Sequence, residues 1–222
     1  MRIVALVPFK ALDHAKSRLK GALNPADRRA LARWMGARVV GALLESDEVE
    51  RIGLVGADPV LAGRWRDESR VVAVHATGLS LNRDLEAGRR WALRQGADTL
   101  LIALGDLPLL TGSAVREMVA LAGAPSHAQT VVIAPDRRKD GTNLLLMVPP
   151  DLLPFAYGRH SLAHHLNAAW RAGVEPAIYR AEEASFDVDT PADLAQLVAR
   201  GLWPPGEREL VMGESDTHGE TS

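Results

Sequence analysis

Short apolar runs rich in β-branched residues alternate with longer stretches of helical periodicity along almost the whole chain. The apolar runs predict strands at 3–9, 51–56, 71–75, 99–104, 130–134, 143–148 and 177–180. The longer stretches predict helices at 24–44, 82–95, 113–122, 161–172 and 190–200. This order predicts an α/β fold with three layers: a mostly parallel, mixed sheet with helices on both faces, as in Rossmann-like domains.

Two of the predicted helices start with similar cap sequences. Asn24-Pro25-Ala26-Asp27 and Thr190-Pro191-Ala192-Asp193 each combine a capping side chain, a proline in the first turn and an acid three residues after the cap. These residues satisfy free backbone N–H groups and suit the positive end of the helix dipole. They therefore fix where both helices begin.

The chain has room for one such domain, which we place at residues 1–205. Residues 206–222 are polar and predict a flexible tail. A formal net charge of -2 argues against nucleic-acid and membrane partners. The absence of cysteine excludes disulfides, zinc–thiolate sites and thiol catalysis. No signal peptide or membrane-spanning run is recognisable, so a cytoplasmic location is expected.

A basic loop follows the first predicted strand. It contains Lys10, Lys16 and Arg18, and in parallel sheets ligands gather at the carboxyl ends of strands. Cations there suit a triphosphate, although a solvated basic surface is the alternative. The loop matches neither the Walker A pattern nor the dinucleotide G-x-G-x-x-G pattern, which argues against both of those nucleotide-binding folds.

Three aspartates stand where a hard metal ion could be held. Asp106 follows the predicted strand 99–104, and Gly105 beside it permits close approach of a ligand. Asp187 and Asp189 are two apart, so in extended chain they face the same side and need a cation nearby. Carboxylates of this kind suit Mg²⁺. The alternatives are a turn-capping role for Asp106 and a helix-starting role for Asp189.

Two further segments could bind an anionic substrate. The loop 135–143 ends in Gly-Thr-Asn, where Thr142 and backbone amides could hold a carboxylate or phosphate; a plain hairpin loop is the alternative. Ser161 begins a predicted helix, whose free N–H groups favour anions. The adjacent His164 and His165 would face different ways on that helix, which argues against a histidine metal site. A serine hydrolase is disfavoured because the chain has no G-x-S-x-G.

Taken in order, these segments resemble one family over about residues 1–200: the 2-phospholactate guanylyltransferases of coenzyme F-420 biosynthesis. That group includes phosphoenolpyruvate and 3-phosphoglycerate guanylyltransferases. The matching segments are VPFKALDHAKSRL, GDLPLL, APDRRKDGTNLLL, FAYGRHSLAHHL and FDVDTPADL. The resemblance implies a nucleotidyltransferase-A fold, GTP as co-substrate, Mg²⁺ as cofactor and a small phosphorylated acid as acceptor.

The resemblance also implies roles for individual residues. The metal ligands would be Asp106, Asp187 and Asp189. The acceptor would be bound by Thr142, Asn143, Gly158 and Ser161. The nucleotide would be bound by Pro8, Lys10, Lys16, Ser17, Arg18, Gly78, Leu79 and Asn82, with Lys10, Lys16, Arg18 and Asp106 acting in catalysis. Two departures stand out: the base-proximal segment reads GLSLN at 78–82, and Arg159-His160 replace the family's usual Pro-Gly.

Three other functions fit parts of the sequence. A phosphatase of the haloacid-dehalogenase group is suggested by Asp187-x-Asp189, but that motif belongs after an early strand. A sugar-phosphate or molybdopterin nucleotidyltransferase would carry a glycine-rich L-x-G-G-x-S first loop, which this chain lacks. A non-catalytic nucleotide-binding regulator on the same fold need not keep all three aspartates. We therefore expect a guanylyltransferase that binds only small molecules, as a monomer or a homodimer.

Overall fold

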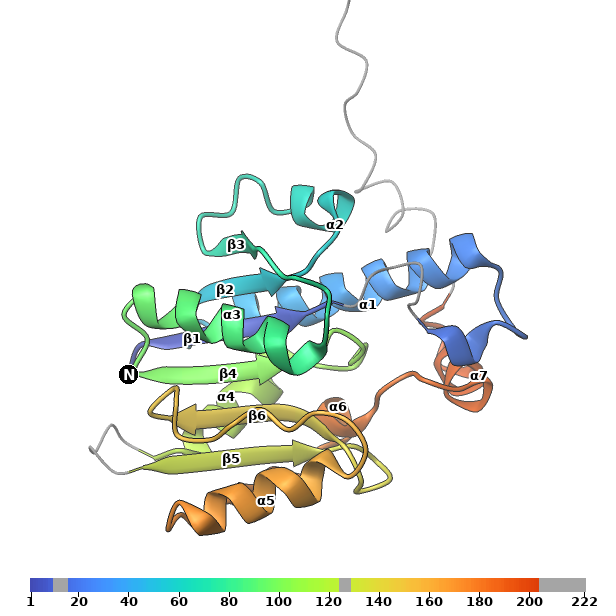
Figure 1. The fold of residues 1–222 in the computed structure, drawn as a ribbon. Helices are drawn as coiled ribbons and strands as arrows, with labels where there is room; N and C mark the ends of the chain where they lie inside the picture. The colour runs from blue at the N-terminus through green and yellow to red at the C-terminus, as the bar shows by residue number, and fades with distance from the viewer. Residues whose placement is uncertain (10–15, 124–128, 204–222) are drawn as a thin grey trace, which may run out of the picture.

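The computed structural model describes residues 1–9, 16–123 and 129–203, and these build one seven-stranded sheet (Figure 1). Across the sheet the strands follow the order β3-β2-β1-β4-β6-β5-β7. Their bounds are β1 Ile3–Pro8, β2 Val49–Val55, β3 Val71–Val74, β4 Thr99–Ala103, β5 Thr130–Pro135, β6 Thr142–Val148 and β7 Ala177–Ile178. The central strands are buried along nearly their whole length, as expected for a sheet covered on both faces.

One strand runs against the others. β1 pairs in parallel with β2 and β4, and β5 pairs in parallel with β7, whereas β6 is antiparallel to both β4 and β5. The cause is local: β5 and β6 are joined by the short loop 136–141, and a short connection permits only antiparallel pairing. The predicted fold class, a mostly parallel mixed sheet, is confirmed.

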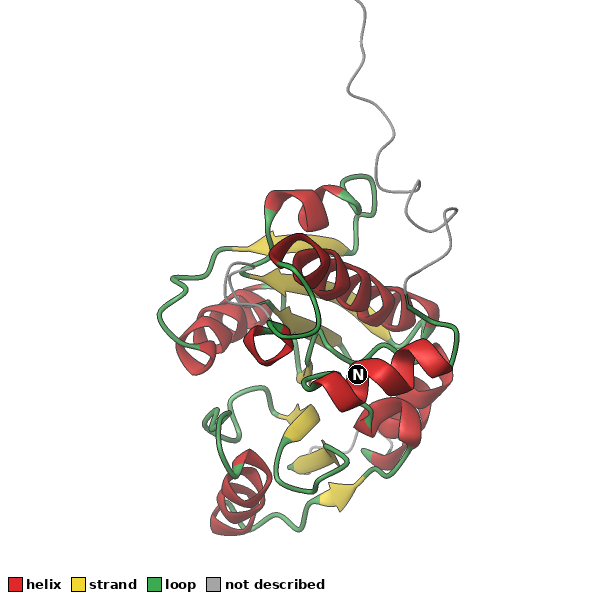
Figure 2. Ribbon diagram, turned by 90° about the vertical axis from the view of Figure 1, so that its right-hand side faces the viewer, coloured by secondary structure: helices red, strands yellow, loops and turns green. Residues whose placement is uncertain are grey.

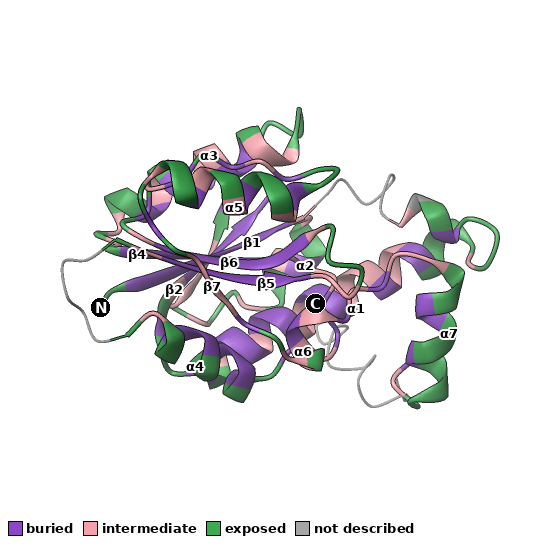
Figure 3. Ribbon diagram, turned by 90° about the horizontal axis from the view of Figure 1, so that it is seen from below, coloured by how far each residue is buried: buried purple, intermediate pink, exposed green. Residues whose placement is uncertain are grey.

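Helices cover both faces of the sheet (Figure 3). One face carries α3 and α5, and the other carries α1, α4 and α6. The helices are α1 Pro25–Glu45, α2 Pro59–Gly63, α3 Leu81–Arg94, α4 Gly112–Leu121, α5 Ser161–Arg171, α6 Glu182–Ser185 and α7 Pro191–Ala199, with a 3-10 turn η2 at Ser17–Leu19. Each face therefore has its own hydrophobic core.

A third, smaller core lies beyond the sheet and supports the segment before α7. Phe186 and Val188 are fully buried there, packed with residues of α1 and α7. The flanking Asp187 and Asp189 are only partly buried, so side chains alternate in and out along this segment. The two aspartates thus share one side, as their spacing predicts.

Both predicted helix caps are confirmed. The Asn24 side chain accepts a hydrogen bond from the Asp27 N–H, and Thr190 and Asp193 form a reciprocal capping box. The sequence did not predict α2, α6 or η2, which are too short to show helical periodicity. The predicted tail 206–222 lies outside the described residues. Within the described part of the chain, no helix is long and apolar enough to cross a membrane.

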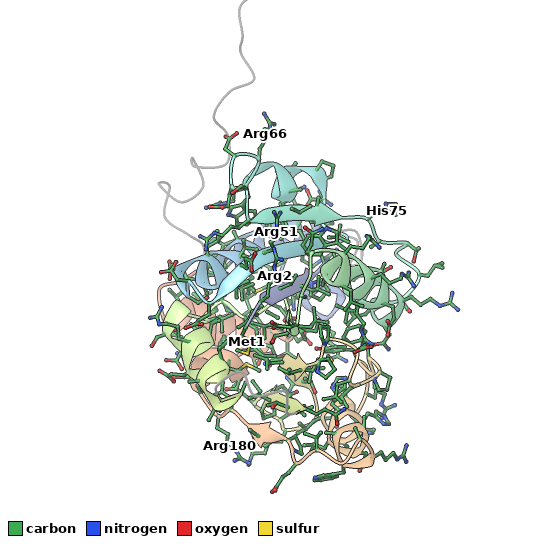
Figure 4. All side chains as sticks on the ribbon, turned by 90° about the vertical axis from the view of Figure 1, so that its left-hand side faces the viewer. Met1, Arg2, Arg51, Arg66, His75 and Arg180 are labelled. Atoms are coloured by element: carbon green, nitrogen blue, oxygen red, sulfur yellow. The ribbon has the colours of Figure 1, made fainter. Side chains whose placement is uncertain are left out.

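Different residues lie at the two ends of the parallel strands. Figure 4 views the end where β1 and β4 begin, and Met1, Arg2 and Arg51 lie there. Asp98 precedes β4 at this end, and its carboxylate accepts a hydrogen bond of 2.8 Å from the Arg2 N–H. The opposite end, which Figure 2 faces, gathers the candidate site residues.

Candidate active site

A cleft with a volume of about 640 Å³ opens at the carboxyl ends of β1 and β4. Its size is in the range of small-ligand sites. Its lining comes from the end of β1, Lys16 with η2, α1, the start of α3, the loop after β4, the β5–β6 loop with the start of β6, the segment leading into α5 and the segment before α7. The cleft therefore lies where an open α/β sheet places its ligands.

Most of the predicted site residues lie in this cleft. Its lining includes Pro8, Lys16, Arg18, Asp106, Thr142, Asn143, Gly158, Ser161, Asp187 and Asp189. Gly78, Leu79 and Asn82 are not part of the lining, although Leu81 next to them is. Ser17 lies in η2. Lys10 lies outside the described residues, so its predicted role stays a prediction.

Gly105 and Asp106 form the tight loop after β4. A Cβ at Gly105 would lie 3.2 Å from the Phe9 ring, so the ring would have to move by a few tenths of an ångström to admit a side chain there. One carboxylate oxygen of Asp106 accepts a bond of 2.7 Å from Lys16. The other, Oδ1, is buried and has no hydrogen-bond partner among the described residues.

Lys16 links two of the aspartates. Its Nζ lies 2.7 Å from Asp106 Oδ2 and 2.8 Å from Asp189 Oδ1, and its side chain is only 9% exposed. Burial alone would lower the pKa of Lys16, but the two carboxylates outweigh burial and raise the pKa above its ordinary value. Lys16 is therefore a permanent cation inside the cleft.

Asp187 and Asp189 belong to a segment that lies directly beside Asp106. The Val188 N–H donates to the Asp106 carbonyl oxygen, at 3.3 Å, and this bond ties the two loops together. Burial, followed by the charges of Asp106 and Asp189, raises the pKa of Asp187 to about 6. The three carboxylates therefore hold more negative charge than Lys16 alone offsets.

This donor set fits a hard divalent cation chemically. It offers three carboxylates, and one of their buried oxygens has no hydrogen-bond partner in the part of the chain that the structure describes. Yet in the described part of the chain, no group of three or more His, Asp or Glu side chains forms a ready-made metal site. The Lys16 ammonium is the cation that two of the three carboxylates share. The predicted metal site thus stays a prediction, with suitable ligands close to one another.

Asp193, in the first turn of α7, fixes the backbone of the 187–189 segment. Its carboxylate accepts hydrogen bonds from the N–H groups of Asp189 and Thr190 and a bond of 2.6 Å from Arg137. Burial alone would raise the pKa of Asp193, but the Thr190 and Asp189 hydrogen bonds and the Arg137 charge hold it below its ordinary value. The cap role of Asp193 is visible in the sequence, whereas its ion pair with Arg137 is not, because Arg137 is distant in the chain.

Asp193→Ala is expected to lower the free energy of unfolding by about 2 kcal/mol, because partly buried N–H groups of Asp189 and Thr190 lose their acceptor. For a chain of this size, that loss lowers Tm by about 4–8 °C. Asp27→Ala is the matched control, since Asp27 holds the equivalent position in α1 but is exposed. Thermal unfolding of both variants measures the two decreases in Tm. Equal decreases for Asp193→Ala and Asp27→Ala would contradict the role of Asp193 in holding the 187–189 segment.

Two hydroxyl groups face the other end of the cleft. The Ser161 Oγ accepts a hydrogen bond of 3.0 Å from the Thr142 N–H, and the Thr142 Oγ1 lies 2.9 Å from His165 Nδ1. The Asn143 amide donates to the carbonyls of Ala184 and Ser185, at 3.0 and 3.2 Å, so it also braces α6. This end presents hydroxyl groups, and the lining around them also holds Asp136, Asp140, Arg138 and Arg159, so charges of both signs lie nearby.

Asn82 and Asp84 hold two loops next to the cleft. The Asn82 side chain accepts from the Tyr157 N–H and donates to the Tyr157 carbonyl, which fixes the loop that carries Gly158. Asp84 is buried and accepts three hydrogen bonds, two from Thr77 and one from the Gly78 N–H. Contact of Asn82 with a nucleotide base stays a prediction, and its observed bonds are structural.

Arg159 and His160, the pair that stands in place of Pro-Gly, lie at the rim of the cleft. His160 is exposed, and its Nδ1 lies 2.5 Å from the Asp140 carboxylate, while the Leu162 N–H donates to the Asp140 carbonyl. Asp140 therefore joins the β5–β6 loop to the start of α5. No pattern in the sequence points to Asp84 or Asp140. The sequence predicts Asp193 only as part of a helix cap and gives no role to His165, because their bonds to Arg137 and Thr142 join residues distant in the chain.

Comparison with known proteins gives a consistent result. A sequence profile of the family described as "Guanylyl transferase CofC like" matches residues 1–203. The chain is 40% identical over 204 residues to phosphoenolpyruvate guanylyltransferase of Rubrobacter xylanophilus, covering 90% of this chain and 96% of that one. It is 28% identical over 211 residues to 2-phospho-L-lactate guanylyltransferase of Methanothermobacter thermautotrophicus, covering 90% and 86%.

The fold is also found in solved structures. A nucleotidyl transferase from Methanothermobacter thermautotrophicus superposes with a TM-score of 0.61 at 17% identity, covering 90% of this chain and 98% of that one. At this identity the likeness concerns the fold alone.

Proposed function

The chain belongs to the CofC-like guanylyl transferase family, and from this membership we infer that it is a guanylyltransferase. We propose that it joins the GMP part of GTP to the phosphate of a small phosphorylated carboxylic acid, with release of diphosphate, in coenzyme F-420 biosynthesis. The curated relatives, named as phosphoenolpyruvate or 2-phospho-L-lactate guanylyltransferases, support this proposal.

The observation that carries the proposal is the division of one cleft into two chemically different ends. Lys16 and the three aspartates, Asp106, Asp187 and Asp189, form one end. The hydroxyl groups of Thr142 and Ser161, beside the start of α5, form the other. With a metal ion on the carboxylates, the first end suits a nucleoside triphosphate, and the hydroxyl groups and the helix start at the second end suit an anionic acceptor.

Phosphoenolpyruvate is the acceptor that the relatives support best, because the 40% identical relative bears that name. 2-Phospho-L-lactate and 3-phosphoglycerate are the other candidates. Each carries a phosphate and a carboxylate. Thr142, Gly158 and Ser161 would hold the acid, with Asn143 bracing the wall behind them. Arg159, also in the lining, adds positive charge near this end.

In the proposed reaction, a phosphate oxygen of the acceptor attacks the α-phosphorus of GTP. A new oxygen–phosphorus bond forms, the bond between the α-phosphorus and the β-phosphate oxygen breaks, and diphosphate leaves. The acceptor phosphate is largely a dianion near neutral pH, so it needs no general base. Lys16 and the more exposed Arg18 would stabilise the charge on the departing diphosphate.

We further propose that Asp106, Asp187 and Asp189 hold Mg²⁺. When bound, the metal would supply positive charge that reduces the repulsion between two polyanions. Asp106 Oδ1, which has no partner among residues 1–9, 16–123 and 129–203, and the raised pKa of Asp187 support a cation at this place. Lys16 already offsets part of the same charge, so the ammonium and the metal would share these ligands.

The guanine base would lie near the segment 78–82. The side chain of Leu79 is exposed, Gly78 adopts a left-handed conformation with φ of 69°, and Asp84 holds the turn between them and β3. An exposed apolar side chain beside the cleft could cover a base. We propose that Gly78 and Leu79 contact the guanine base, and that Pro8, which lines the cleft, contacts the nucleotide. A cytoplasmic location and a homodimer remain further proposals.

Diphosphate release from GTP in the presence of Mg²⁺ tests the proposed function. Separate reactions contain phosphoenolpyruvate, 2-phospho-L-lactate or 3-phosphoglycerate, and ATP and CTP replace GTP in control reactions. We expect release that requires both GTP and an acceptor, fastest with phosphoenolpyruvate. Folded protein that binds GTP but releases no diphosphate with any of the three acids would contradict the proposal.

A further inference from the structure

His165 is a buried titratable side chain that the proposed chemistry does not use. It lies in α5 behind the acceptor end of the cleft, with no exposed surface. Both ring nitrogens have partners: Nδ1 lies 2.9 Å from Thr142 Oγ1, and Nε2 lies 3.1 Å from the Ala156 N–H. The Tyr157 ring packs edge-on against it, with 4.9 Å between the ring centroids.

These partners fix which nitrogen carries the proton. A backbone N–H can only donate, so Nε2 accepts from Ala156 and has no proton. The ring proton therefore sits on Nδ1 and is donated to the Thr142 hydroxyl oxygen. Burial, and then the neighbouring His164, lowers the pKa of His165 to about 4, so the ring is neutral near pH 7.

The fixed tautomer sets the direction of the Thr142 hydroxyl. Its oxygen accepts from His165 Nδ1–H, which leaves the hydroxyl hydrogen to be donated to another group. Thr142 lines the cleft, so a bound substrate is the available acceptor. Ser161 repeats this arrangement, because its oxygen accepts from the Thr142 N–H and its own hydrogen is left to donate.

His165 also joins the two walls of the acceptor end. Thr142 begins β6, and Ala156 belongs to the loop that leads to Gly158 and the start of α5. One neutral ring therefore holds the hydroxyl on one wall and the loop backbone on the other.

We propose that His165 is a positioning residue that holds the Thr142 hydroxyl as a hydrogen-bond donor toward a carboxylate or phosphate oxygen of the acceptor acid. The proposal rests on the proposed function, since it assigns a selectivity for anions to the same cleft. A pocket whose hydroxyls both donate favours an anionic oxygen and disfavours a ligand that must donate there.

The kinetic test is a double-mutant cycle between His165→Leu and Thr142→Val. His165→Leu alone is expected to raise the KM for the acceptor about tenfold or more, the effect of losing one hydrogen bond to a charged group. The KM for GTP should change less than about twofold. In the Thr142→Val background, His165→Leu should add little, because the hydroxyl that it positions is already gone.

The control and the conservative variant sharpen this test. His164→Leu makes the same change at the neighbouring exposed histidine and should leave the acceptor KM as in the wild type. His165→Asn keeps a donor close to the Nδ1 position and should restore most of the acceptor affinity. An unchanged acceptor KM in folded His165→Leu, or a full additional loss in the Thr142→Val background, would overturn the proposal.

A spectroscopic test does not depend on the proposed function. Two-bond ¹H–¹⁵N correlation spectra of the imidazole rings at pH 7.5 should show His165 as the neutral tautomer with its proton on Nδ1. A proton on Nε2, or a charged ring, would overturn the proposal even in an active enzyme. If the wild type transfers no guanylyl group but shows the Nδ1–H tautomer, the proposed function fails and the positioning of Thr142 stands.

Discussion

Asp106→Asn is expected to lower kcat by about a thousandfold or more while the protein stays folded. The substitution keeps the shape of the side chain but removes one of the three charges in the proposed metal site. Losing such a ligand costs several kcal/mol of transition-state stabilisation, and each 1.36 kcal/mol is a factor of ten in rate. The backbone bond from the Val188 N–H to the Asp106 carbonyl is unaffected, so the loop geometry should persist.

The matched control for this variant is Asp98→Asn, the same change at the opposite end of the same strand. The Asp98 carboxylate accepts hydrogen bonds from Arg2 and Thr99, far from the cleft. Steady-state kinetics of both variants, with circular dichroism to check folding, make the comparison. Activity of Asp106→Asn within tenfold of the wild type would show that Asp106 does not act in catalysis.

Lys16→Met is expected to have the second largest effect, with a loss of about a hundredfold in kcat. Lys16 is the buried cation of the site, and a single group that stabilises developing charge contributes at about this level. The variant also leaves Asp106 and Asp189 facing each other without a shared cation. Mg²⁺ should therefore raise the Tm of Lys16→Met more than it raises the Tm of the wild type.

The exposed Lys20 provides the control for Lys16, through Lys20→Met. That variant should keep wild-type kinetics and the wild-type response of Tm to Mg²⁺. The measurements are kcat with saturating substrates and thermal unfolding with and without the metal. Equal Mg²⁺ effects on Lys16→Met and the wild type would contradict the idea that the ammonium and the metal share carboxylates.

Much of the fold could be predicted because its strands and long helices are periodic in sequence. The cap sequences fixed helix starts to within a residue, as at Pro25 and Pro191. The order of the strands and the reversed direction of β6 could not be predicted from the sequence. Hydrophobic periodicity indicates whether a segment is a helix or a strand, but not which strands pair with each other. The short α2 and α6 have fewer residues than a helical pattern needs.

Some residues of the candidate site could also be predicted from the sequence, and others could not. Asp106, Asp187 and Asp189 could be found because they follow strands or alternate with buried residues. The structure brings Asp106 and Asp189 together on Lys16, with Asp187 near enough that burial and then their charges raise its pKa. His165 could not be assigned a role from the sequence. The prediction that it and His164 face different sides of the helix is confirmed, since His164 is exposed and His165 is buried. Its bond to Thr142 depends on a strand distant in the chain.

An isotope experiment tests whether an acceptor phosphate attacks the α-phosphorus of GTP. Phosphoenolpyruvate carrying ¹⁸O in its phosphate is incubated with the enzyme, GTP and Mg²⁺, and the products are analysed by mass spectrometry. We expect a diphosphate-bridged guanosine conjugate that retains all of the label, together with unlabelled diphosphate. Labelled diphosphate, or GDP and orthophosphate in place of the conjugate, would contradict it.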